Sequence, residues 1–177
     1  MNQKQRIITL FGTSRADEQD EVFRTAEQMG ALLARSGYAV ANGGYGGVML
    51  ASARGAASVG GRVIGVTCRA FKRSPNPYLT EEIPTDTLTE RLASLIRLGS
   101  AYLVFAGGTG TLLELADVWE HKNKGFPGTD KPIILMGNFW QPLVQMMAQA
   151  DPKSTRCLRT AETPSEALTI LQQEGLR

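Results

Sequence analysis

Glu114 is a carboxylate placed where a phosphate would be expected to bind. It comes three positions after the glycine-rich stretch of residues 107–111, about one turn into the helix expected there. A carboxylate repels a nearby phosphate, so Glu114 suggests a role other than holding one. Such a group can stabilise a developing positive charge or deprotonate water. Arg91 lies in an earlier helical segment. Taken alone, each of the two is more often an ordinary exposed charge.

The segment around Glu114 predicts a buried strand, a tight turn and a helix. Residues 102–105 are a short apolar run typical of a central parallel strand. The turn residues combine backbone freedom with a threonine (Thr109 or Thr111) that could cap the helix. The first N–H groups of a helix have no partner inside it, so they attract anions. The phosphate-binding residues expected in this turn are Gly107, Gly108, Thr109, Gly110 and Thr111.

Two other turns have a similar composition. Residues 12–15 follow the first strand and include Ser14, which could contact a ligand. Residues 42–47 follow the second strand, and their four glycines exceed what a turn requires, which favours close approach of a ligand at Gly43, Gly44 and Gly46. The sequence has no G-x-G-x-x-G after its first strand and no P-loop motif. A nicotinamide-dependent dehydrogenase and a P-loop protein are therefore disfavoured.

These turns must be positioned by an alternation of strands and helices along the chain. The expected strands cover residues 6–11, 38–41, 62–66, 102–105 and 132–135. The expected helices cover residues 17–35, 48–59, 87–98, 111–121 and 139–150, with a final strand or extended piece and a helix capped near Thr163 within 157–177. Residues 67–84 are expected to be a long irregular loop.

This pattern predicts an α/β fold, a Rossmann-like three-layer sandwich with a mostly parallel sheet, in a single domain over residues 1–177. In such sheets ligands bind beyond the carboxyl ends of the strands, where the strand order reverses. The turns at residues 12–15, 42–47 and 106–111 all belong to that edge of the sheet. Their convergence is a stronger indication of a binding site than any one turn.

Composition and charge argue against several classes of protein, namely those that bind nucleic acids, membranes or metals. The chain has 177 residues, 42% of them hydrophobic and 20% charged, with a net charge of +2, so nothing favours nucleic acid or membrane surfaces. It contains no apolar run near the roughly 20 residues that a spanning helix needs. Cys68 and Cys157 have no metal or redox spacing, and there is one histidine. We expect a cytoplasmic protein without a metal or cofactor.

Three segments together resemble the LONELY GUY (LOG) family of cytokinin riboside monophosphate phosphoribohydrolases. Residues 107–114, Gly-Gly-Thr-Gly-Thr-Leu-Leu-Glu, resemble the family's P-G-G-x-G-T-x-x-E signature. Residues 43–66 are similar to its glycine turn, small-residue helix and following strand, and Thr89-Glu90-Arg91 looks like its M-x-x-R segment. The resemblance covers residues 7–147. It implies that Arg91 and Glu114 are catalytic and that the partner is a purine nucleoside 5′-monophosphate, AMP or an N6-modified AMP.

The same resemblance leaves alternatives open. Ala106, Leu113, Leu92 and Leu88 stand where the family often has Pro, Glu, Lys and Met. These differences are compatible with a non-catalytic carrier of a nucleotide or of the molybdenum cofactor, or with a structural or regulatory module. Lysine decarboxylation, an older label of the family, is disfavoured because no lysine lies in a glycine-rich loop.

The family also implies a homodimer or a higher homo-oligomer. In this chain we expect residues 48–59 and 87–98 to form the packing surfaces between copies. If the dimer closes over the site, Arg97 would reach into the neighbouring copy's pocket.

Overall fold

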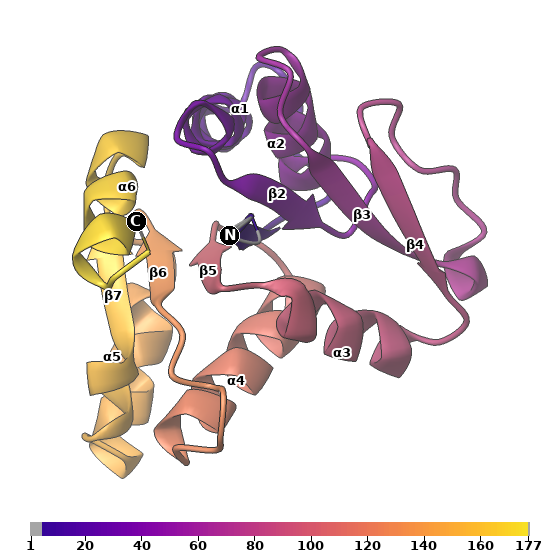
Figure 1. Ribbon diagram of the computed structural model, residues 1–177. Helices are drawn as coiled ribbons and strands as arrows, with labels where there is room; N and C mark the ends of the chain where they lie inside the picture. Colours follow the sequence, from indigo (N-terminus) through magenta and orange to yellow (C-terminus); the bar gives the residue numbers. More distant parts are fainter. Residues whose placement is uncertain (1–4, 177) are drawn as a thin grey trace.

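The computed structural model describes residues 5–176, and in these residues seven strands form one sheet (Figure 1). Every pair of neighbouring strands is parallel. The predicted α/β class with a parallel sheet is therefore confirmed; the ends of the expected domain, residues 1–4 and 177, lie outside the described residues. The strands are β1 (Ile7–Phe11), β2 (Ala39–Asn42), β3 (Val63–Cys68), β4 (Glu81–Thr85), β5 (Ala101–Val104), β6 (Ile133–Met136) and β7 (Leu158–Ala161).

Helices cover both faces of the sheet, which makes the predicted three layers (Figure 1). On one face α1, α2 and α6 enclose a core with β1 and β2, and on the other α3, α4 and α5 enclose a second core. No helix in residues 5–176 is long and apolar enough to cross a membrane. The helices are α1 (Glu21–Arg35), α2 (Val48–Ala57), α3 (Leu88–Leu98), α4 (Thr109–Asn123), α5 (Gln141–Ala150) and α6 (Pro164–Gln173), with short 3-10 turns η1 (Arg69–Phe71) and η2 (Ser154–Cys157).

The strand order is β4-β3-β2-β1-β5-β6-β7. The chain starts at β1, builds outward to the β4 edge, and then returns to place β5 on the other side of β1. The order therefore reverses between β1 and β5. The turns that follow these two strands meet beyond their carboxyl ends, where the Thr13 N–H donates to the Ala106 carbonyl oxygen at 2.9 Å.

The prediction of a long irregular loop at residues 67–84 was partly wrong, because β4 begins within this segment. This strand pairs with β3 from Glu81 to Thr85 and lies at the edge of the sheet. Most of its side chains are exposed, so it lacks the apolar signal of the central strands. Pro84 also argued against a strand, yet an edge strand tolerates a proline because one side of its backbone has no partner.

Several helix termini differ from expectation, and the starts of α1 and α4 have a clear local cause. Helix α1 begins at Glu21 and not at residue 17, because Asp17 and Asp20 form a local turn in which the Asp17 N–H donates to Asp20 Oδ2 at 2.9 Å. Helix α4 begins at Thr109 after Gly108, with no side-chain cap, so the expected capping by Thr109 or Thr111 was wrong. The N-terminal end of α4 consequently keeps its N–H groups available to a ligand.

Threonine side chains cap two helices, and the cap predicted near Thr163 is confirmed. Thr87 and Glu90 form a reciprocal capping box at α3, with the Glu90 N–H donating to Thr87 Oγ1 at 3.2 Å. Thr163 caps α6 by accepting the N–H of Glu166 at 3.2 Å. The box at α3 fixes the first turn of the helix that carries Arg91.

Candidate functional site

A cavity of about 600 Å³ lies beyond the carboxyl ends of the central strands. Its size is within the usual range for small-molecule sites. Its walls come from the turns after β1 and β2, the segment after β3, the first turns of α3 and the first turns of α4. This is the reversal point of the strand order, where ligands of doubly wound sheets bind.

Most of the site residues predicted from the sequence meet in this cavity. Those that line it are Arg91, Glu114, Gly108, Thr109, Gly110, Thr111, Gly43 and Ser14. Gly44, Gly46 and Gly107 do not line it. Their missing side chains serve local packing instead: a Cβ on Gly107, for example, would lie 2.2 Å from Thr111 Oγ1.

The start of α4 forms part of the cavity wall. The Leu112 N–H makes the first bond of the helix, to the Gly108 carbonyl oxygen at 2.9 Å. The N–H groups of residues 109–111 come before that bond, so the helix itself offers them no acceptor. Gly108 and Gly110 have open space where a Cβ would be. This combination of free donors, positive helix dipole and uncrowded backbone suits an anionic group.

Arg91 is buried, with 8% of its side chain exposed, and reaches the cavity from α3. Its Nε donates to the Val66 carbonyl oxygen at 2.9 Å, and its Nη2 lies 3.8 Å from Met49 Sδ. A Cβ on Gly43 would lie 1.6 Å from Nη2. Close approach of a ligand was predicted at Gly43, and in the structure the Arg91 guanidinium is the group that lies against its backbone.

Glu114 faces Arg91 across the inner part of the cavity. Its Oε1 lies 3.6 Å from Arg91 Nη1, and 13% of its side chain is exposed. No hydrogen bond to the Glu114 carboxylate is found in residues 5–176. Burial raises the pKa of Glu114 to about 7, and the nearby Arg91 charge only partly opposes this. The carboxyl group therefore exists in both protonation states near neutral pH.

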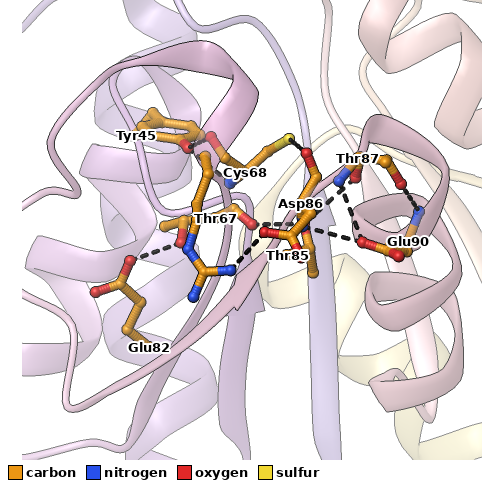
Figure 2. Close-up of polar contacts among 9 residues, drawn as sticks. Tyr45, Thr67, Cys68, Glu82, Thr85, Asp86, Thr87 and Glu90 are labelled. Carbon is orange, nitrogen blue, oxygen red and sulfur yellow. Dashed lines mark hydrogen bonds and ion pairs between the residues drawn. The ribbon is translucent and has the colours of Figure 1, made fainter.

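Tyr45 forms part of the wall next to Arg91 and is itself fixed by the backbone of β3. Its hydroxyl donates to the Cys68 carbonyl oxygen at 3.1 Å and accepts from the Cys68 N–H at 2.8 Å. Figure 2 shows this contact and the network behind it, in which Cys68 Sγ lies 3.7 Å from the Asp86 carbonyl oxygen, next to the capping box of Thr87 and Glu90. The end of β3, the edge strand and the start of α3 are thus joined.

Several cavity residues were missed from the sequence. Tyr45 stands inside the predicted glycine turn but was not singled out, and Phe71 and Arg73 lie in the segment expected to be irregular. An aromatic residue between two pairs of glycines could have indicated Tyr45. Leu88, Leu92 and Leu113 were noted only as departures from the LOG pattern, and all three line the cavity.

The chain has relatives among characterised and uncharacterised proteins. It is 31% identical over 161 residues to an uncharacterised protein of Archaeoglobus fulgidus, an alignment that spans 91% of each chain. It is 34% identical over 120 residues to a cytokinin riboside 5′-monophosphate phosphoribohydrolase of Mycobacterium tuberculosis. That alignment covers 66% of this chain and 63% of the relative.

The fold is shared with solved structures. The molybdenum cofactor binding protein from Rippkaea orientalis superposes with a TM-score of 0.79 at 22% identity, over 96% of this chain and 97% of that one. At that identity the likeness concerns the fold alone. The model of the SLOG cluster4 family matches residues 5–168, nearly the whole chain. The protein therefore belongs to the SLOG cluster4 family and is LOG-like, as its glycine motifs predicted.

Proposed function

We propose that the protein is a phosphoribohydrolase. It cleaves the N-glycosidic bond of a purine nucleoside 5′-monophosphate, AMP or an N6-modified AMP, to release the free base and ribose 5-phosphate. The observation that carries this proposal is the position of Glu114, buried beside Arg91 and one turn from the open start of α4. A relative at 34% identity that is named as a cytokinin riboside 5′-monophosphate phosphoribohydrolase supports it.

The geometry matches the requirements of this reaction. The 5′-phosphate binds the N–H groups at the start of α4, which orients the ribose toward Glu114. Cleavage of the C–N bond develops positive charge on the sugar, and the Glu114 carboxylate stabilises it. The same carboxylate accepts a proton from the attacking water, for which a pKa of about 7 is well suited. Arg91 supplies the cationic groups that hold ligand oxygen atoms.

The direct test is to incubate the protein with AMP and with an N6-substituted AMP and to separate the products by chromatography. We expect free base and ribose 5-phosphate in equal amounts. Glu114 acts in its ionised form, so kcat/KM should fall as the pH drops through about 7. If no base is released from any nucleoside monophosphate, the proposed activity is wrong.

A variant pair separates the chemistry from binding. Glu114→Ala should reduce kcat by at least about 100-fold, because both charge stabilisation and proton transfer are lost. Glu120→Ala is a suitable control: Glu120 lies on the same helix but outside this cavity, and its removal should leave kcat unchanged. Full activity in Glu114→Ala would remove this residue from the mechanism.

The second proposal is that the protein carries a phosphorylated ligand without converting it. It is favoured by Leu92 and Leu113, apolar residues in the cavity at positions where the LOG pattern often has Lys and Glu. The shared fold with a molybdenum cofactor binding protein is compatible with it. Mass spectrometry of ligand extracted from the native protein tests this proposal. An intact phosphorylated ligand without turnover on incubation would support the carrier.

A further inference from the structure

The Arg91 guanidinium sits on neutral groups. Its Nε is bonded to a backbone carbonyl oxygen, Nη2 approaches the Met49 sulfur, and the backbone at Gly43 lies directly beneath. None of these groups carries a formal charge. The position of Arg91 is therefore set by shape and by neutral contacts as well as by its attraction to Glu114.

Two aromatic rings also lie beside the Arg91 guanidinium. Together with the neutral groups described above, they form what we call the Arg91 seat. The Arg91 Cζ atom lies 5.8 Å from the centre of the Tyr45 ring and 5.5 Å from that of Phe71. The two ring centres are themselves 5.8 Å apart, with their planes tilted by 51°. The guanidinium thus rests in the corner between the two rings, which we call the aromatic pair. Both distances are within the range in which a cation is attracted to an aromatic ring.

Arg91 and Glu114 form a buried ion pair without a direct hydrogen bond between them. Direct hydrogen-bonded pairs have N···O distances of about 2.7–2.9 Å, whereas Nη1 and Oε1 are 3.6 Å apart. Attraction is strong where water is scarce, so the two groups would close this gap unless something held them. The contacts that keep Arg91 from moving onto Glu114 are those of the Arg91 seat, with the Val66 carbonyl oxygen, Met49 and the two aromatic rings.

We propose that Phe71 and Tyr45 are positioning residues, which hold the Arg91 guanidinium in the corner of the aromatic pair and so prevent it from closing onto Glu114. The carboxylate then remains available to a ligand and to water. The two rings contribute differently. Tyr45 is anchored by its hydroxyl to both backbone groups of Cys68 (Figure 2), whereas Phe71 lies on η1 with 39% of its surface exposed.

The electrostatic surroundings make this proposal testable through Glu114. The charged residues that line the cavity with it are Arg91 from α3, Arg15 from the turn after β1 and Arg73 from the segment after η1. A guanidinium that moves from 3.6 Å to direct contact favours the ionised carboxylate more strongly. Loss of the aromatic pair should therefore lower the pKa of Glu114.

The experiment follows the titration of the Glu114 carboxyl carbon by NMR in the intact protein. In Phe71→Leu, which keeps the apolar bulk but removes the ring, we expect the pKa to fall by about one unit or more. Tyr45→Phe, which keeps the ring but removes its anchor, should lower the pKa less. Phe126→Leu is the matched control, since Phe126 is an exposed phenylalanine outside the cavity. An unchanged pKa in both Phe71→Leu and Tyr45→Phe would overturn the proposal.

A second comparison excludes a simpler explanation, in which Phe71 only shields Glu114 from water. The Phe71→Leu substitution is repeated in an Arg91→Gln background. If Phe71 acts by holding Arg91, the substitution has no effect on the pKa of Glu114 once the guanidinium is absent. A fall of equal size in both backgrounds would show shielding and would contradict the positioning role.

The meaning of this arrangement for catalysis rests on the proposed phosphoribohydrolase activity, but the titration does not. If the activity exists, the acid limb of the kcat/KM profile moves to lower pH in Phe71→Leu by the same amount as the pKa of Glu114. A shifted titration in a protein without activity would support the positioning role and reject the proposed function. An active protein in which the pKa of Glu114 does not shift would support the proposed function and reject the positioning role.

Discussion

Glu114, the proposed catalytic group, opposes the stability of its own fold. Its carboxyl group is surrounded by the cavity wall, so ionisation in the folded state is unfavourable and its pKa rises from 4.5 to about 7. In the unfolded chain the group ionises at its usual pH. The folded protein therefore binds an additional proton between these two values, and stability falls as the pH rises through this window.

This difference predicts the behaviour of Glu114→Gln, which resembles the protonated side chain at every pH. A shift from 4.5 to about 7 corresponds to roughly 3 kcal/mol of lost stability above pH 7. We expect the variant to be more stable than the native protein by up to that amount at pH 8, and similar to it at pH 4. Denaturant unfolding at the two pH values measures the difference. An equal effect of the substitution at both would contradict burial as the origin of the pKa shift.

At the scale of elements, the packing of α1 on α2 is organised by small residues. Gly30 on α1 faces the Ser52 carbonyl oxygen, where a Cβ would lie at 2.1 Å, and Gly55 on α2 faces the Glu27 carbonyl oxygen, where it would lie at 1.9 Å. The two helices therefore approach backbone to backbone. This layer supports β1 and β2, and so fixes the turns that follow them.

We predict that Gly55→Ala destabilises the protein by roughly 2 kcal/mol, because backbone atoms must move to accept the methyl group. Gly110→Ala is the matched substitution on α4, where a Cβ meets nothing within 4 Å. There the better helix propensity of alanine should leave the stability unchanged or raise it by up to about 1 kcal/mol. Thermal or denaturant unfolding of both variants provides the comparison. Similar effects at the two positions would refute the close packing of α1 and α2.

At the scale of the whole molecule, we expect copies of the chain to associate. Helix α2 was one of the two expected interface helices, but it is largely buried by its own chain, chiefly against α1. Helix α3 keeps Leu88 exposed beside the cavity. Arg97, on the same helix, is exposed and lies outside this chain's own cavity. Its reach into a neighbouring copy remains a prediction.

We predict a homodimer in which α3 contributes to the interface. Leu88→Glu should convert it to a monomer, since a buried charge without a partner is strongly unfavourable, while an acidic residue at a helix start does not harm the fold. Light scattering after size-exclusion chromatography measures the mass directly. Met146→Glu on α5, where Met146 is also an exposed apolar residue, should leave the mass unchanged. A native protein with the mass of one chain would refute the dimer.

The sequence alone determined the central elements and most of the candidate site. Buried strands such as β1 and β5 are short apolar runs, and the glycine-rich turns after β2 and β5 are local signals, so residues 107–111 and their place at the start of a helix could be read directly. Arg91 and Glu114 required the family pattern, because an isolated charge carries no local signal of burial. The edge strand β4 was missed, since exposed side chains and Pro84 hide its pairing.

Only the tertiary structure decided what surrounds Glu114. The strand order brings the turn after β2, the segment after β3 and the first turns of α3 to one cavity, although they are far apart in the chain. Through this arrangement Gly43 makes room for Arg91, and Tyr45 and Phe71 become its neighbours. Burial, and with it the pKa of Glu114, depends on these long-range contacts. No spacing along the sequence encodes them.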